Sequence, residues 1–190
     1  MPRWLPSKWP TCCGAWNPKT VAAKRPAAGT KAQAPAGTKV SVPVGATGRR
    51  ARSLARRLAV QALYQLQINP RPWVDTQRQF AADPESDRAD LDYFRELIAA
   101  IAPHREALDT RLALLCEIPP AELDPIEHAV LWLGLHELTS CADLPYRVAL
   151  AEAVQLAKQF GATDGHKFVN AVLDRAAREL RPTEYGQPSA

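Results

Sequence analysis

Apolar residues recur at three- and four-residue steps along the chain after Arg49, which is the period of an amphipathic helix. In the first such stretch Ala55, Ala59 and Leu63 share one side of the helix. Further helical stretches follow around residues 73–80, 87–101, 105–116, 124–138, 145–160 and 163–180. Apolar and polar residues nowhere alternate as they would in a strand. The pattern therefore predicts an all-α fold of about seven helices, arranged as a bundle or a pair of subbundles.

The ends of these helices carry recognisable signals. Asp124 precedes Pro125, which is the order expected of an N-cap followed by proline at the first helical position. Gly161 follows an apolar helical stretch and is predicted to end it in the left-handed conformation. Thr163 and Asp164 open the last helical stretch, and Pro182 lies beyond it.

The first 48 residues have a different character from the rest. They contain seven prolines with Ala, Gly, Thr and Lys between them, and they show no apolar period. Such a segment cannot offset its ordering entropy by burying apolar surface. We expect a disordered basic extension over residues 1–48, a helical domain over 49–182 and a short tail over 183–190.

Charge is divided unevenly along the chain. Residues 1–74 hold thirteen Lys and Arg and no acid, whereas the remainder holds twenty acids against eleven bases, which gives the net charge of +4. Arginines gather where the first helix begins, at the end where positive charge opposes the helix dipole. Their position favours binding of a polyanion, of which nucleic-acid phosphate is the commonest.

Signals for catalysis or metal binding are missing from the sequence. Gly161 to Gly165 lacks the preceding strand and the lysine of a phosphate-binding loop, and His136 lacks a second histidine at zinc spacing. The cysteines match neither a disulfide framework nor a zinc site, and no membrane or signal segment is recognised. We expect a cytoplasmic protein with reduced thiols, no cofactor, no metal and no enzymatic activity.

Several sequence blocks, taken in order, resemble the NusB family. An arginine-rich entry, RRAR at 49–52 and ARR at 55–57, leads into AVQALY at 59–64. Later blocks are DYFREL at 92–97, AVL at 129–131, LPY at 144–146, EAVQLAK at 152–158 and KFVNAVLD at 167–174. The resemblance spans residues 49–182. It implies two three-helix subbundles that bind the single-stranded boxA element of RNA together with the ribosomal protein NusE, so that RNA polymerase resists termination of ribosomal RNA transcription.

The same resemblance implies site residues. The arginines of the entry correspond to phosphate ligands, and the first helix offers an amide and an aromatic ring to bases. The turn into the last helix corresponds to a second patch near RNA, and one acidic residue corresponds to the partner surface. The implied RNA-binding residues are Arg49, Arg50, Arg52, Arg56, Arg57, Gln61, Tyr64, Asp164, Lys167 and Phe168, and the implied partner residue is Glu127.

Four positions depart from the family pattern, namely Trp132, His136, Ala151 and Ala171, and they bear on partner binding more than on the fold. Alternatives also remain open. A related fold forms the RNA-binding domain of ribosomal-RNA cytosine methyltransferases, but no catalytic domain with a glycine loop follows here. A DNA-binding regulator requires a basic recognition helix after a tight turn. An adaptor would use the acidic body to hold a basic protein.

Overall fold

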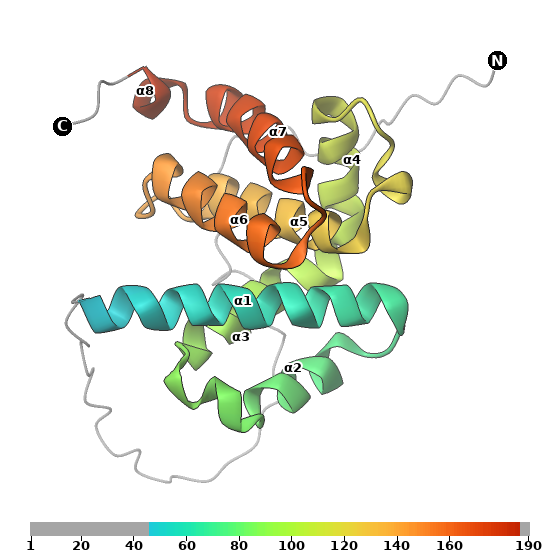
Figure 1. Cartoon of the computed structure of the whole chain (residues 1–190), viewed down its shortest axis with the longest axis vertical. Coiled ribbons are helices and arrows are strands. Elements are labelled where there is room, and N and C mark those ends of the chain that lie inside the picture. The colour runs from blue at the N-terminus through green and yellow to red at the C-terminus, as the bar shows by residue number, and fades with distance from the viewer. Residues whose placement is uncertain (1–45, 187–190) are drawn as a thin grey trace, which may run out of the picture. The chain divides into compact units, whose positions relative to one another are not determined.

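The computed structural model describes residues 46–186, and it places a helix on each of the seven predicted stretches (Figure 1). No strand occurs within these residues, which confirms the all-α fold. Three short 3-10 helices and one four-residue helix complete the secondary structure of residues 46–186. The α-helices are α1 (Ala46–Ile68), α2 (Trp73–Ala81), α3 (Leu91–Ile101), α4 (Arg105–Leu115), α5 (Pro125–Ser140), α6 (Tyr146–Phe160), α7 (Gly165–Leu180) and α8 (Pro182–Tyr185).

Capping explains where several helices begin. The Asp124 carboxylate accepts a hydrogen bond from the backbone N–H of Ile126 at 2.9 Å, and Pro125 fills the first helical position, as predicted. Asp90 caps α3 in the same way by accepting from Tyr93 N–H at 3.1 Å. The prediction for Gly161 is wrong in its conformation, because its φ of −83° and ψ of −179° are extended rather than left-handed.

Two groups of helices meet at α1 and α5. Helices α1, α2 and α3 pack together, α5, α6 and α7 form the second group, and α1 lies directly against α5 (Figure 1). Helix α5 is buried on every side between His128 and Leu135, as its continuous apolar sequence indicates. This arrangement agrees with the expected pair of subbundles.

The expected domain limits can be compared only in part with the structure. Helix α1 begins at Ala46 instead of Arg49, and α8 extends past the expected end at 182. The predicted disordered extension over 1–48 lies, up to residue 45, outside the described residues, and so do residues 187–190 of the predicted tail. No helix in the described part of the chain is long and apolar enough to cross a membrane.

Candidate nucleic-acid interface

One face of α1 carries cationic side chains in its first half and an amide and an aromatic ring in its second. Arg50, Arg57, Gln61 and Tyr64 are separated by seven, four and three residues, so they share one side of a helix with 3.6 residues per turn. Arg50 is exposed, Arg57 and Gln61 are half-buried, and Tyr64 is 39% exposed. We call these four residues the α1 stripe.

Arg57 joins the α1 stripe to the second predicted patch. Its guanidinium lies 5.7 Å from the centre of the Phe160 ring, at the C-terminal end of α6. The chain then turns through Gly161 into α7, where the exposed Lys167 forms an ion pair with Asp164 at 2.7 Å. Both partners of that pair are mostly in solvent, so an arriving phosphate can compete for Lys167 at little cost.

Phe168 and Asp164 contribute differently to this turn. Phe168 is half-buried and packs against the core, which leaves only part of its ring for another contact. Asp164 occupies the N-cap position of α7, yet its side chain makes no capping hydrogen bond. Of the predicted residues in this turn, Lys167 is therefore the one that offers positive charge to an anion.

Arg56 does not belong to the surface, and its prediction as a phosphate ligand is corrected. Only 2% of it is exposed, and its Nε donates to Glu137 Oε1 at 2.7 Å. Its other nitrogens face Tyr93, at 3.4 Å from the hydroxyl, and Glu152, at 3.6 Å from Oε2. Tyr93 also donates to Glu137, and Ser53 Oγ donates to Glu152 at 3.0 Å. These five residues tie α1 to α3, α5 and α6, and we call them the buried cluster.

Burial governs ionisation in the buried cluster. Burial alone would lower the pKa of Arg56, but the Glu137 carboxylate beside it prevails and the pKa is raised. Burial raises the pKa of Glu137, while Arg56 and the Tyr93 hydroxyl oppose that change. The second carboxylate oxygen of Glu137 has no hydrogen-bond partner among the described residues. The cationic Arg56 is thus the main compensation for a fully buried carboxylate.

A helical wheel could have separated Arg56 from its neighbours. Arg56 is three residues before Ala59 and seven before Leu63, so it lies in phase with the core side of α1. Arg57 lies one residue further along, on the opposite flank. Glu137 gave a matching signal, since it stands between apolar residues of a helix buried on all sides. No role was predicted for Glu137 from the sequence.

The remaining arginines of the entry, Arg49 and Arg52, lie outside the α1 stripe. Arg49 is exposed. Arg52 points toward α3, where its guanidinium lies 5.2 Å from the centre of the Tyr93 ring and its Nε lies 3.7 Å from Asp90 Oδ2. Its side chain is still 54% exposed. Arg52 therefore remains accessible, but it faces another direction than Arg50 and Arg57.

Glu127, the predicted partner residue, lies against the turn that carries Lys167. A Cβ atom at Gly165 would overlap the Glu127 carboxylate, so glycine leaves room for that group at the start of α7. Burial and the nearby Asp124 raise the pKa of Glu127, and a hydrogen bond from the backbone of Ala162 opposes them. The partner and RNA predictions thus fall on adjacent parts of the molecule.

The departures from the family pattern are accommodated in different ways. Trp132 Nε1 donates to Asp109 Oδ1 at 2.7 Å, and His128 Nε2 lies 2.5 Å from the same oxygen, so α4 and α5 are joined by this shared carboxylate. Burial lowers the pKa of His136 to about 4, so the ring is neutral at pH 7. Ala151 and Ala171 are both exposed.

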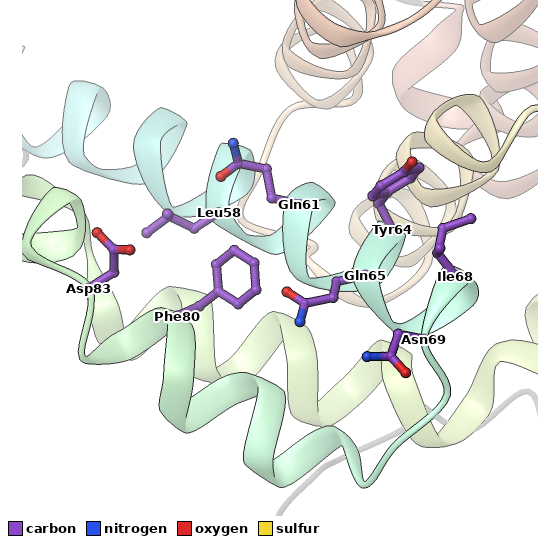
Figure 2. A pocket seen from close by; sticks show the side chains of 8 residues that line it. All are labelled: Leu58, Gln61, Tyr64, Gln65, Ile68, Asn69, Phe80 and Asp83. Atoms are coloured by element: carbon purple, nitrogen blue, oxygen red, sulfur yellow. The ribbon is translucent and has the colours of Figure 1, made fainter.

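A groove of about 480 Å³ lies between α1 and α2 (Figure 2). It adjoins the second half of the α1 stripe, because Gln61 and Tyr64 belong to its lining. Its lining consists of Leu58, Gln61, Tyr64, Gln65, Ile68, Asn69, Phe80 and Asp83. Elsewhere in residues 46–186, no group of His, Cys, Asp and Glu could hold a metal ion.

Comparison with known proteins agrees with the expected family. Residues 53–178 match the model of the NusB family. The chain is 46% identical over 133 residues to a transcription antitermination protein NusB from Idiomarina loihiensis, covering 70% of this chain and 96% of that protein. It is 45% identical over 136 residues to the protein of the same name from Methylobacillus flagellatus, covering 72% and 88%.

Solved structures share the fold. T. maritima NusB has a TM-score of 0.65 and 25% sequence identity, covering 72% of this chain and 97% of that one. A structure of the antitermination factors NusB and NusE in complex with dsRNA has a TM-score of 0.60 at 21% identity, covering 68% and 98%. The relatives are named for a role in transcription instead of a reaction, which agrees with the expectation that this chain is not an enzyme.

Proposed function

Because this chain belongs to the NusB family, we propose that it is a transcription antitermination factor that binds single-stranded RNA of the boxA type together with the ribosomal protein NusE. In this role it acts within an antitermination complex on RNA polymerase and supports transcription of ribosomal RNA operons. The proposal is supported by the family match and by the similar fold of a NusB that is found in a complex with NusE and dsRNA.

The observation that carries RNA binding is the α1 stripe. Arg50 lies in the second turn of α1 and Arg57 near its middle, and neither forms an ion pair with an acid among residues 46–186. Their charges are therefore available to nucleic-acid phosphates. Gln61 and Tyr64 follow on the same face, where bases attached to the bound phosphates are within reach. Phosphates held by cations and bases met by amides and aromatic rings are the usual mode of single-strand recognition.

We propose that the partner binds to the surface around Glu127. Residues from Asp75 onward hold twenty acids against eleven bases, which suits a basic protein such as a ribosomal protein. Since Glu127 lies against the turn that carries Lys167, RNA and partner would meet on neighbouring surfaces. We expect weak RNA binding by this chain alone and stronger binding when NusE is present.

Fluorescence anisotropy with a labelled boxA-type RNA, measured over a series of salt concentrations with and without NusE, tests the proposal. The double variant Arg50→Ala/Arg57→Ala removes two stripe cations, and we expect weaker binding and a salt slope smaller by about 1.4, at about 0.7 for each lost contact to a single strand. Arg78→Ala/Arg95→Ala is the matched control, because both of these arginines are exposed and paired only with aspartates on their own helices.

The outcomes separate the proposed function from its rivals. If wild-type protein fails to bind the RNA even with NusE, the proposal is wrong. Preferred binding of duplex DNA would support a DNA-binding regulator. NusE binding without any effect on RNA affinity would support an adaptor. Equal loss in the two double variants would show that net charge, and not the α1 stripe, governs binding.

A further inference from the structure

The groove between α1 and α2 has the chemistry of a nucleobase site. Half of its lining residues are apolar or aromatic, and the others are three carboxamides and Asp83. Figure 2 shows the ring of Phe80 reaching from α2 toward α1, between Leu58 and Gln65. Asn69 lies beside Gln65 at one end of the groove, and Tyr64 belongs to the same lining. A groove that combines aromatic and aliphatic side chains with carboxamides fits a planar heterocycle that has donors and acceptors on its edge.

The carboxamides of the groove are not engaged by the protein. Gln61, Gln65 and Asn69 make no side-chain hydrogen bond to another described residue. Other glutamines nearby behave differently, since Gln67 Nε2 donates to the Pro125 carbonyl at 2.8 Å and Gln77 Nε2 donates to the Arg95 carbonyl at 3.0 Å. Three unengaged amides around one hollow are therefore available to a ligand, whereas Gln67 and Gln77 are held by backbone carbonyls of the protein.

The groove continues the path of the cationic residues. Arg57 stands eight residues before Gln65 on the same helix, which is about 12 Å along the axis at 1.5 Å per residue. Gln61 lies between them and belongs both to the α1 stripe and to the groove lining. A strand whose phosphate contacts Arg57 therefore passes the open side of the groove, where one base can leave the stack and enter.

We propose that this groove is a subsite for one unstacked RNA base, with Phe80 and Tyr64 as its apolar and stacking surfaces and with Gln65 and Asn69 reading the base edge. This inference rests on the proposed function, because it requires that RNA is bound. It adds to that function a place where base identity, instead of phosphate charge, is recognised. It also assigns a role to Gln65, Asn69 and Phe80, none of which belongs to the α1 stripe.

Base preference is the property to measure. Labelled dodecamers of U, C and A are titrated with the full chain by anisotropy at several salt concentrations. We expect wild-type protein to prefer one of them. In Gln65→Ala and in Asn69→Ala the affinity for the preferred dodecamer falls about fivefold or more, and the ratio between dodecamers moves toward one, while the salt slope is unchanged. Gln155→Ala, an exposed glutamine on α6, is the matched control and keeps the preference.

Aromatic variants test stacking separately from edge recognition. Tyr64→Ala is expected to weaken binding about five- to hundredfold, and Tyr64→Phe, which keeps the ring, to restore most of it. Dodecamers that carry 4-thiouridine should crosslink on irradiation to Tyr64 or Phe80, as mass spectrometry of the digested protein would reveal. Circular dichroism of each variant checks that the helices are intact.

The result that overturns the groove assignment differs from the result that overturns RNA binding. If wild-type protein binds RNA but shows no preference, or if Gln65→Ala and Asn69→Ala keep the preference, the groove is not a base site although the proposed function stands. A loss of NusE binding without RNA in these variants would make the groove a protein contact and would equally refute the inference. Failure of wild-type protein to bind any RNA refutes both proposals.

Discussion

Replacing Arg56 by Met tests the division of the arginine-rich entry into buried and exposed members. Arg56 and Arg57 are adjacent in sequence, yet Arg56 is 2% exposed and Arg57 stands half-buried at the surface over Phe160. Methionine has a long, flexible side chain that can fill much of the volume left by Arg56. The change therefore removes the charge and the hydrogen bonds while limiting the loss of packing.

The loss of stability in Arg56→Met depends on the groups that the change leaves without a partner. Glu137 is fully buried, and without Arg56 the Tyr93 hydroxyl is the one hydrogen-bond donor that its carboxylate retains among the residues that the structure describes. Removing one member of a buried ion pair costs about 3–5 kcal/mol. We expect Arg56→Met to lower the free energy of unfolding by an amount in that range. Arg57→Met should cost less than about 1 kcal/mol, as is usual for charges near the surface.

A second change in the buried cluster measures the interaction between Arg56 and Glu137. In the double variant Arg56→Met/Glu137→Leu no buried charge is left between α1 and α5. The double variant should therefore be more stable than Arg56→Met alone, with a coupling energy of about 1–3 kcal/mol. Arg56 would keep Glu152, 3.6 Å away, in a Glu137→Leu single variant, so that change should cost less than Arg56→Met.

Urea unfolding at pH 7, followed by circular dichroism at 222 nm, measures these differences, and RNA anisotropy at low temperature measures binding of the folded variants. We expect the two variants to have opposite effects on stability and on RNA binding. Arg56→Met destabilises the protein and leaves the salt slope of RNA binding intact, whereas Arg57→Met keeps the stability and lowers the slope. The reasoning is refuted if Arg56→Met costs under about 1 kcal/mol and abolishes RNA binding, because Arg56 would then be a phosphate ligand.

Three further changes address the core and the helix ends. Burial lowers the pKa of His136 to about 4, so the unfolded chain binds a proton at a higher pH than the folded protein does. The free energy of unfolding should therefore fall by up to about 3 kcal/mol as the pH drops from about 6.5 to about 4. His136→Tyr should flatten this dependence in urea titrations at pH 7 and 5. Gly134→Ala should lower the free energy of unfolding by about 1–3 kcal/mol, because the added Cβ would lie 2.6 Å from Leu173 Cδ1. In a Leu173→Ala background, where this contact is absent, the same change should stabilise the protein. Asp124→Ala should lower the thermal midpoint through the loss of its cap, worth about 0.5–2 kcal/mol.

Helices and their faces follow from the sequence because they depend on local spacing. The 3.6-residue period located all seven long helices, and the Asp124-Pro125 pair located the start of α5. Local signals also have limits. Gly161 follows the last residue of α6, as predicted, but its backbone is extended, because the next helix starts only after a short turn to Gly165.

The candidate site was harder to predict, since it depends on contacts between distant residues. Glu137 is 81 positions from Arg56 in sequence, so no local pattern could show that this arginine is neutralised inside the protein. The approach of Arg57 to Phe160 depends in the same way on how α1 and α6 pack. The groove requires α2 to lie along α1, which makes Phe80 a neighbour of Gln65, and no spacing in the sequence indicates that contact.

The continuity of α1 constrains how its surface can be altered. The helix runs without a break from Ala46 to Ile68, and its inward side is fixed by the buried ion pair of Arg56. Each inserted residue turns the remainder of the helix by about 100°. An insertion between Arg57 and Gln61 would therefore rotate the amide and the aromatic ring away from the arginines, or else force the core side of the helix out of register. Only additions or deletions near a whole turn keep both sides aligned, so the length of this recognition surface can change in steps of about three or four residues.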